Sequence, residues 1–494
     1  MIQYKSTRGS RLEKNGAQAI IRGIAEDKGL YVPDSFPSLP CSLSELKGLD
    51  YRETAYRVLC QFLTDYSAED LRRCVDSAYD SKFEAEEIVP VVKAGDACFA
   101  ELYHGKTAAF KDMALSILPY LLTTAMKKEK EDSKIVILTA TSGDTGKAAL
   151  EGFADVPGTE IIVFYPEEGV SQVQERQMVS QEGKNTHVYA IKGNFDDAQT
   201  GVKQIFNDRE FGAELAARGM KLSSANSINI GRLIPQVAYY VWSYVKLLEK
   251  GVLKEGEPMN AVVPTGNFGN ILAAYYAKQM GVPIQRFICA SNENKVLTDF
   301  ITTGVYDIHR DFHLTNSPSM DILISSNLER LLYHLSGGDG EEIQALMNSL
   351  EKEMRYEVGQ RIKEGLSDFY GGFATEEETK AAIGRMYASD GYLMDTHTAV
   401  AYKVYEDYRK ETGDTAPAVI ASTASAYKFA DSVTEAVGLP AFADGFACIS
   451  ALNAKTGVRV PKGLAGLEYK KILHTGVVEK DCLMDAVKDA LKDQ

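Results

Sequence analysis

The segment 260–270 has the residue types of an anion-binding turn. An apolar run of strand character is followed by Gly266 and Gly269 and then by a helical pattern. Glycine lets a backbone approach a ligand closely, and the first N–H groups of a helix have no partner within it. The glycine spacing is not G-x-G-x-x-G, so a dinucleotide is not indicated. A plain strand-to-helix turn would show the same pattern, and both interpretations stay open.

A second polar turn, at 141–147, follows another apolar run. Its Gly146-Lys147 pair resembles the end of a P-loop, but Thr141 stands where a P-loop requires glycine. Ala148 also replaces the hydroxyl residue that would hold Mg²⁺. What remains is a loop of hydroxyl and N–H donors that suits a carboxylate or a phosphate, although helix capping would explain the same residues. The candidate residues are Ser142, Gly143, Asp144 and Thr145.

Two further polar stretches precede helical patterns. In the first, Asn226, Ser227 and Arg232 lie within a few residues of one another, and the planar fork of an arginine pairs with phosphates or carboxylates through two hydrogen bonds. In the second, Thr423 and Ser425 follow a predicted buried strand, where open α/β sheets bind ligands. Capping turns are the alternative interpretation of both stretches.

Lys111 is the candidate nucleophile. It follows a run of small and apolar residues and precedes a helical pattern that is apolar on one face. Desolvation at the start of such a helix would lower the lysine pKa and allow imine formation. A lone lysine is more often an ordinary surface residue. The sequence contains neither metal-ligand spacing nor a G-x-S-x-G nucleophile motif.

These turns require a scaffold whose strands end beside one another. Six short runs rich in Val and Ile predict buried parallel strands. Helical patterns follow several of these runs, which predicts an α/β architecture with crossover helices. The predicted strands are 135–139, 160–165, 187–191, 260–264, 286–290 and 417–421.

Changes in pattern along the chain predict three units. Helical patterns at 54–63 and 68–78 dominate the beginning of the chain, and alternating strands and helices follow. The predicted units are a mainly helical N-terminal domain (1–92), a large α/β domain (93–130 and 235–494) with a helical insertion (about 340–388), and a small α/β domain (131–234).

Composition narrows the class of protein. The formal net charge of −15 argues against nucleic-acid binding, although it does not exclude a small anionic substrate held by local cations. The seven cysteines are scattered and form no C-x-x-C, which favours a reducing cytoplasm. We also expect neither a signal peptide nor a membrane span, because no apolar run approaches the ~18 residues required.

The motifs together closely resemble the threonine synthase family, in its bacterial and fungal branch with an extended N-terminal domain. The resemblance implies a fold-type II pyridoxal phosphate enzyme, similar to the tryptophan synthase β subunit. It further implies a carbon–oxygen lyase that converts O-phospho-L-homoserine and water into L-threonine and phosphate through γ-elimination. The matching stretches are 23–33, 101–112, 139–146, 226–232, 264–270, 319–322, 397–401 and 422–429.

The resemblance also implies a role for each candidate residue. Lys111 would hold the cofactor in the large domain, Thr423 would face its pyridine nitrogen, and the 142–145 loop would hold the substrate carboxylate. Arg232, with Asn226 and Ser227, would bind the substrate phosphate. The role of Asp144 stays open, because an aspartate cannot donate a hydrogen bond unless it is protonated. The cofactor phosphate would bind to Gly266, Asn267, Phe268, Gly269 and Asn270.

Two positions depart from the family pattern. Members often have proline where this chain has Lys106, which could add a cation near the substrate or simply be exposed. Some members have histidine at the position of Ser425, which puts a proton-transfer role there in doubt.

Two other functions remain as alternatives. The first is another fold-type II lyase, such as a threonine or serine dehydratase or a cysteate synthase-like enzyme. The second is a binding protein without turnover, either with or without pyridoxal phosphate. Arg232 and the long N-terminal region favour threonine synthase. The resemblance implies a small-molecule substrate, no nucleic-acid or membrane partner, and either a monomer or a homodimer.

Overall fold

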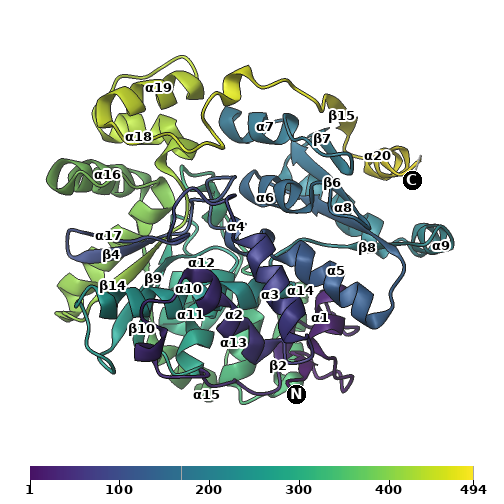
Figure 1. Cartoon of the computed structure of the whole chain (residues 1–494), viewed down its shortest axis with the longest axis horizontal. Coiled ribbons are helices and arrows are strands. Elements are labelled where there is room, and N and C mark those ends of the chain that lie inside the picture. Colours follow the sequence, from purple (N-terminus) through teal and green to yellow (C-terminus); the bar gives the residue numbers. More distant parts are fainter. Residues whose placement is uncertain (169, 493–494) are drawn as a thin grey trace.

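Two β-sheets organise the chain, and the computed structural model describes residues 1–168 and 170–492 of it (Figure 1). The six-stranded sheet is parallel except for its last pair, and the five-stranded sheet is parallel throughout. The first has the order β13 (Phe369–Phe373), β10 (Ile284–Ser291), β9 (Met259–Pro264), β14 (Ala418–Ser422), β4 (Ala97–Glu101) and β3 (Val91–Ala94); the second has the order β15 (Gly476–Glu479), β7 (Thr186–Lys192), β6 (Thr159–Pro166), β5 (Lys134–Ala140) and β8 (Met220–Ser223).

The predicted α/β class and all six predicted strands are confirmed, as β5, β6, β7, β9, β10 and β14. β6 and β9 are buried along their whole length, since helices cover both faces of each sheet. α10 (Ile230–Glu249) and α11 (Gly269–Gln279) pack on one face of the six-stranded sheet, and α17 (Thr396–Thr412) packs on the other. The five-stranded sheet lies between α6 (Asp144–Phe153) on one face and α8 (Phe195–Asn207) on the other.

Shorter helices complete the α/β region. Their bounds are α4 (Asp112–Leu115), α5 (Leu118–Glu129), α7 (Gln172–Val179), α9 (Arg209–Ala217), α12 (Val296–Thr303), α13 (Leu328–Leu335), α18 (Ala430–Ala436), α19 (Gly445–Thr456) and α20 (Leu483–Ala490), with 3₁₀ turns η2 (Pro318–Met320), η3 (Leu366–Asp368), η4 (Ala426–Phe429) and η5 (Leu467–Tyr469).

The chain before β3 is mainly helical. α2 (Tyr51–Phe62) packs against α10, and α1 (Gly16–Arg22) packs against α5. The indole Nε1 of Trp242 on α10 donates to the Val89 carbonyl at 2.7 Å, which ties this region to the six-stranded unit. The remaining elements are α3 (Ala68–Ala78), η1 (Leu43–Leu46) and the antiparallel pair β1 (Tyr4–Ser6) and β2 (Tyr31–Pro33).

The segment predicted as a helical insertion is not wholly helical. It contains α14 (Gly340–Glu353), α15 (Gln360–Gly365) and α16 (Glu376–Asp390), but also β12 (Arg355–Glu357), which pairs with β11 (Val305–Asp307). The segment also contains β13, at the edge of the six-stranded sheet. The two glycines at 371 and 372 lower the strand propensity of β13 and hide it from pattern analysis. A side chain at either position would collide with Thr298 or Val404.

The C-terminal elements lie on the five-stranded sheet. β15 pairs with β7, and α20 packs against β15 and α8. This pairing differs from the prediction that residues 235–494 all belong to the large α/β domain. β15 has only four residues, so its position depends on tertiary contacts and not on its own pattern. The other domain boundaries stay predictions.

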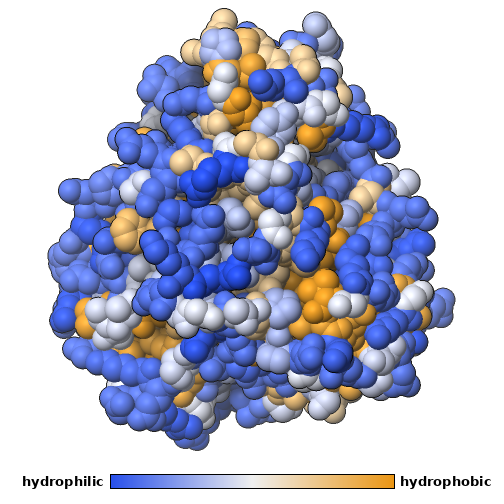
Figure 2. Space-filling view, turned by 90° about the vertical axis from the view of Figure 1, so that its left-hand side faces the viewer, coloured by the Kyte–Doolittle hydropathy of each residue, from blue (hydrophilic) through white to orange (hydrophobic). Residues whose placement is uncertain are grey.

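Apolar side chains gather mainly in three buried clusters, one of which extends through both sheets and the N-terminal helices. Hydrophilic side chains cover most of the face in Figure 2, where apolar residues form scattered patches. Within residues 1–168 and 170–492, no helix has the length and apolar character needed to cross a membrane.

Candidate active site

The predicted site residues meet where strands of the two sheets end. Lys111 precedes α4, which lies between the sheets in Figure 1. The Phe110 N–H donates to the Thr423 carbonyl at 2.7 Å, so the loop that follows β14 holds the loop that carries Lys111. From the other sheet, Asp144 places a carboxylate oxygen 3.6 Å from Lys111 Nζ. Residues predicted separately from two sheets are thus brought together.

Lys111 is buried, with 9% of its surface exposed, and is not an ordinary surface lysine. Its Nζ donates to Ser319 Oγ at 3.2 Å, from η2. Burial lowers the pKa of Lys111, the carboxylate of Asp144 acts in the opposite direction, and the cations Lys428 and Arg232 lower the pKa further. A lysine with a lowered pKa is a better nucleophile and base near neutral pH.

Asp144 is the first residue of α6 and is also buried. Its Oδ1 lies 2.6 Å from Lys428 Nζ and accepts a hydrogen bond from Gln174 Nε2 at 2.8 Å. Burial alone would raise the pKa of Asp144, but Lys428 and Lys111 hold it well below its usual range. The carboxylate is therefore ionised and accepts hydrogen bonds, and its role towards a ligand stays a prediction.

The turn between β9 and α11 has the shape of an anion cradle. Phe268 has a left-handed backbone, with φ of +64°, and α11 begins at Gly269, so its first N–H groups have no partner within the helix. The Asn270 side-chain oxygen accepts hydrogen bonds from two tyrosine hydroxyls, of Tyr239 at 2.8 Å and Tyr240 at 2.5 Å. Its Nδ2 is buried and has no hydrogen-bond partner among residues 1–168 and 170–492. An N–H donor is thus left for a ligand.

Arg232, near the start of α10, is a buried cation for which the described residues supply no counterion. Only 4% of its surface is exposed; its Nη1 donates to the Ala225 carbonyl at 2.8 Å, and its Nε has no partner. Among residues 1–168 and 170–492, no carboxylate forms an ion pair with it. Burial lowers the pKa of Arg232 to about 10. An unpaired buried charge is costly, so this guanidinium suits an anionic ligand.

The two residues predicted beside Arg232 differ in position. Ser227 Oγ accepts a hydrogen bond from Asn327 Nδ2 at 3.3 Å, and the same amide nitrogen donates to the Asn267 carbonyl at 2.9 Å. Ser227 is therefore linked to the α11 turn. Asn226 is exposed, and its backbone N–H donates to Ser224 Oγ. That contact is a local turn, and the cap of α10 is Asn229.

A buried carboxylate on α17 supports both sides of Lys111. Asp395 caps the helix, and its Oδ2 lies 2.8 Å from Nδ1 of His397. His397 Nε2 accepts the backbone N–H of Ser319 at 3.1 Å. The other oxygen of Asp395 accepts from the Thr398 hydroxyl, which in turn accepts the Thr423 N–H at 3.3 Å. One side chain thus positions the residue that contacts Lys111 and the residue predicted at the pyridine nitrogen.

The structure also explains the two departures from the family pattern. Lys106 Nζ pairs with Glu151 Oε1 at 2.7 Å, and half of its side chain is exposed. Ser425 is buried and caps η4, where its Oγ accepts the Tyr427 N–H at 3.4 Å. Both side chains thus have partners within the protein.

Several residues of the site were missed from the sequence. Ser319, His397 and Lys428 lie in stretches that carried the family resemblance, yet residue type and spacing assigned them no role. Their importance depends on contacts between distant segments, since Ser319 and Lys111 are 208 residues apart. The one signal for Lys428 in the sequence was its position shortly after the hydroxyl-rich loop that follows the predicted strand 417–421.

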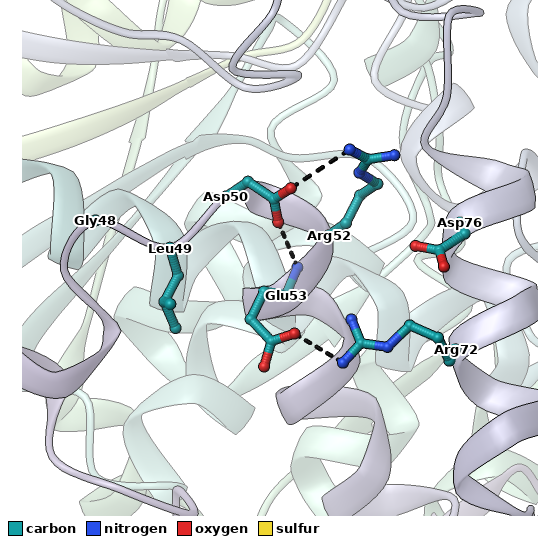
Figure 3. Close-up of a pocket in the computed structure, with 7 residues that line it drawn as sticks. All are labelled: Gly48, Leu49, Asp50, Arg52, Glu53, Arg72 and Asp76. Atoms are coloured by element: carbon teal, nitrogen blue, oxygen red, sulfur yellow. Dashed lines mark hydrogen bonds and ion pairs between the residues drawn. The ribbon is translucent and has the colours of Figure 1, made fainter.

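A depression of about 740 Å³ on the N-terminal helices differs from the site around Lys111 in the pairing of its charged side chains. Figure 3 shows the charged side chains that line it, from α2 and α3. Glu53 pairs with Arg72 at 2.7 Å, and Asp50 lies 3.5 Å from Arg52. Its arginines therefore have carboxylate partners, unlike Arg232, and no predicted site residue lines it.

The buried donors around Lys111 fit the cofactor expected from the resemblance. Pyridoxal phosphate requires an amine with a lowered pKa, and Lys111 provides one. Its phosphate requires free N–H donors, which the first turn of α11 and Asn270 Nδ2 provide.

Family models match nearly the whole chain. The model described as threonine synthase N terminus matches residues 3–79, the pyridoxal-phosphate dependent enzyme model matches residues 96–424, and the threonine synthase C-terminal model matches residues 398–472.

Individual relatives agree with the family models. The chain is 42% identical to threonine synthase-like 1 of Homo sapiens over 434 residues, which cover 85% of the chain and 58% of that relative's length. It is 37% identical to threonine synthase of Pseudomonas aeruginosa over 442 residues, which cover 88% of the chain and 90% of that relative. The crystal structure of threonine synthase from Brucella melitensis with pyridoxal phosphate bound superposes with a TM-score of 0.88, at 35% identity and 99% coverage of both chains.

Proposed function

The chain belongs to the threonine synthase family of pyridoxal-phosphate-dependent enzymes, and from this premise we propose that it converts O-phospho-L-homoserine and water into L-threonine and phosphate. The buried guanidinium of Arg232 carries the proposal. Lys111 and Lys428 share the Asp144 carboxylate, whereas Arg232 has no carboxylate partner among the described residues. A phosphorylated substrate would supply the missing negative charge.

We assign the remaining roles from the family resemblance and the positions of the side chains. Lys111 carries the cofactor, the turn from Gly266 to Asn270 holds its phosphate, and Thr423 faces its pyridine nitrogen. The cofactor supplies stabilisation of negative charge at the substrate carbons. Once the substrate amine has replaced it, Lys111 is free as the base that removes and returns protons at those carbons.

We assign substrate binding to two segments. Hydroxyl and N–H groups of Ser142 and Thr145 meet the substrate carboxylate, since the Gly143 N–H already donates to Thr141 Oγ1 at 3.0 Å and the ionised Asp144 stays with its two lysines. Arg232 and Ser227 hold the substrate phosphate, with Asn226 at the exposed rim of the site. Arg232 also retains the released phosphate, which is then available to activate the water that completes the reaction.

We place this activity in threonine biosynthesis in the cytoplasm. All seven cysteines are free, which favours a reducing compartment. We keep both a monomer and a homodimer for the assembly.

The decisive experiment supplies the full chain with pyridoxal phosphate and O-phospho-L-homoserine and measures phosphate and threonine together. Equal amounts of the two products are expected, and neither is expected with Lys111→Ala. Arg232→Met should raise the KM for the phosphorylated substrate by about 100-fold, because it removes a charged partner of the phosphate.

The controls separate the alternatives. L-threonine and L-serine lack the phosphate, so Arg232→Met should change any turnover of these two amino acids far less than that of O-phospho-L-homoserine. Phosphate accompanied by 2-oxobutyrate would assign the chain to a dehydratase-like lyase. Absence of turnover with the cofactor bound would remove the substrate assignment.

A further inference from the structure

Lys428 is a second lysine at the site, and the proposed reaction gives it no role. It lies in η4, none of its side chain is exposed, and its Nζ donates to the Thr107 carbonyl at 3.0 Å. An ammonium group loses its hydration when it is buried this deeply, and only a close ionic partner compensates. That partner is Asp144, at 2.6 Å.

Asp144 is shared unequally between two lysines. Its Oδ1 contacts Lys428 and Gln174, whereas its Oδ2 faces Lys111 at the longer distance of 3.6 Å. Attraction between charges in a buried site falls as their separation grows, so Lys428 takes the larger share of the carboxylate. Lys111 is left with a weak ionic partner and with the neutral hydroxyl of Ser319.

We propose that Lys428 is a positioning residue that acts through Asp144 to keep the nitrogen of Lys111 from being held in its protonated form. If Lys428 were neutral, the carboxylate would turn to Lys111 as its one remaining cation. A tightly paired ammonium can neither form the bond to the cofactor nor accept a proton from the substrate. This inference rests on the proposed function in one respect, namely that Lys111 carries the cofactor.

The groups around Lys111 come from four elements. Asp144 faces it from α6, Lys428 from η4, Arg232 from α10 and Ser319 from η2. Asp144 is the one among them that favours the protonated amine, and Lys428 and Arg232 oppose it. The neighbouring carboxylate of Asp112 instead accepts both the N–H and the hydroxyl of Thr107, at 2.8 and 2.7 Å.

Charge removal at the two residues should therefore shift the protonation of the Lys111 nitrogen in opposite directions. Lys428→Met should raise the pH midpoint by about one unit or more, because Asp144 then acts on Lys111 alone. Asp144→Asn should lower the midpoint by a similar amount. The double variant Lys428→Met/Asp144→Asn should fall between Asp144→Asn and the unmodified chain, because both charges are absent. Lys428→Arg keeps the positive charge and should restore a midpoint close to that of the unmodified chain.

The measurement is a pH titration of the absorbance of pyridoxal phosphate bound to each full-length variant, with circular dichroism as the control for folding. The expected order of midpoints, from low to high, is Asp144→Asn, the double variant, the unmodified chain and Lys428→Met. Equal midpoints in folded variants would mean that Lys428 is only structural, and a reversed order would overturn the inference as well. If Lys428→Met does not fold, the positions of Asp144→Asn and the double variant still decide. Asp144→Asn leaves the buried Lys428 without its ionic partner, so its midpoint is compared only where circular dichroism shows it folded.

Lys111→Ala separates this inference from the proposed function. Loss of the pH-dependent cofactor band in Lys111→Ala, together with the expected order, would support both proposals. Loss of the band without the order would remove the role of Lys428 alone. A band that persists in Lys111→Ala would overturn the assignment of Lys111 and, with it, the inference.

Discussion

The starts of α6 and α11 look alike in sequence and differ in charge. Each helix follows a buried parallel strand and a polar turn with glycines, and each turn is a predicted anion site. α6 begins with the ionised carboxylate of Asp144, which is paired with Lys428. α11 begins with Gly269 and the uncharged Asn270, whose Nδ2 has no partner.

The difference teaches that the first turn of a helix is left open for a phosphate where the chain places no anion of its own in it. The partial positive charge at the first turn of a helix stabilises a carboxylate or a phosphate. At α6 the protein supplies the negative charge itself, through the carboxylate of Asp144, and this carboxylate influences the protonation of Lys111. At α11 the same position is left for a phosphate from outside the chain.

The largest expected effect comes from making α11 resemble α6. Asn270→Asp keeps an oxygen for the two tyrosine hydroxyls and places a negative charge where Nδ2 lies. Like charges placed together at a binding site cost several kcal/mol, so the affinity for pyridoxal phosphate should fall by about 100-fold or more. Fluorescence titration of the cofactor-free chain measures the change.

Pyridoxal, which lacks the phosphate, is the matched control ligand for Asn270→Asp. Its affinity should be nearly unchanged in the variant. An equal loss of affinity for both ligands would show that α11 does not discriminate the phosphate, and the contrast with α6 would disappear.

The next largest effect is expected where the turn before α11 leaves no room for a side chain at Gly266. A methyl group on Gly266 would lie 2.5 Å from the backbone oxygen of Ser319, the residue that contacts Lys111. Gly266→Ala should therefore destabilise the fold by about 1–3 kcal/mol and weaken cofactor binding by about tenfold. Urea unfolding and cofactor titration give the two values.

Gly269→Ala is the control in the same turn. Its methyl group would lie 3.6 Å from Asn327 Nδ2, an ordinary contact distance. The affinity for pyridoxal phosphate should therefore be lower in Gly266→Ala than in Gly269→Ala. Equal losses would indicate a general sensitivity of the turn and no specific need for space at Gly266.

The smallest expected effect is a pH dependence of stability that comes from Asp112, the buried carboxylate at the start of α4, and not from Asp144. Burial raises the pKa of Asp112 to about 6, although the hydrogen bonds from Thr107 and the charge of Lys428 act in the opposite direction. A carboxyl whose pKa is raised by folding stabilises the fold when protonated, and that contribution is lost as the pH rises through about 6. Asp144, with its lowered pKa, contributes no change in this range.

Lowering the pH from about 7 to about 5 should therefore stabilise the native chain through Asp112, on the order of 1–2 kcal/mol. Asp112→Asn should lack this component while keeping the hydrogen bond from the Thr107 hydroxyl. The urea midpoint measured at both pH values provides the comparison. An unchanged pH dependence in the variant would assign the effect to other groups.

The strands and the turns that follow them could be predicted from the sequence. Asp144, Gly266 and Thr423 each follow a run of Val and Ile, and polar residues after such runs mark the carboxyl ends of buried strands. The loops are therefore local features. β13 was missed because Gly371 and Gly372 break its pattern, although the tight packing around them requires glycine.

Contacts between distant segments could not be predicted in the same way. Lys428 is next to Asp144, and His397 holds the backbone of Ser319, through folding alone. The ionisation of Asp144 at the start of α6 also depends on these contacts, because a buried aspartate without cationic partners would tend to take up a proton.

The position of β15 has a consequence for how the chain is made. β7 is complete when the ribosome reaches Lys192, but its outer neighbour β15 begins only at Gly476. At ~5–20 residues per second, β7 stays an open sheet edge for roughly 15 to 60 s during synthesis. An unpaired strand edge can pair with other chains. During this period, a chaperone that covers the edge of β7 would prevent such pairing.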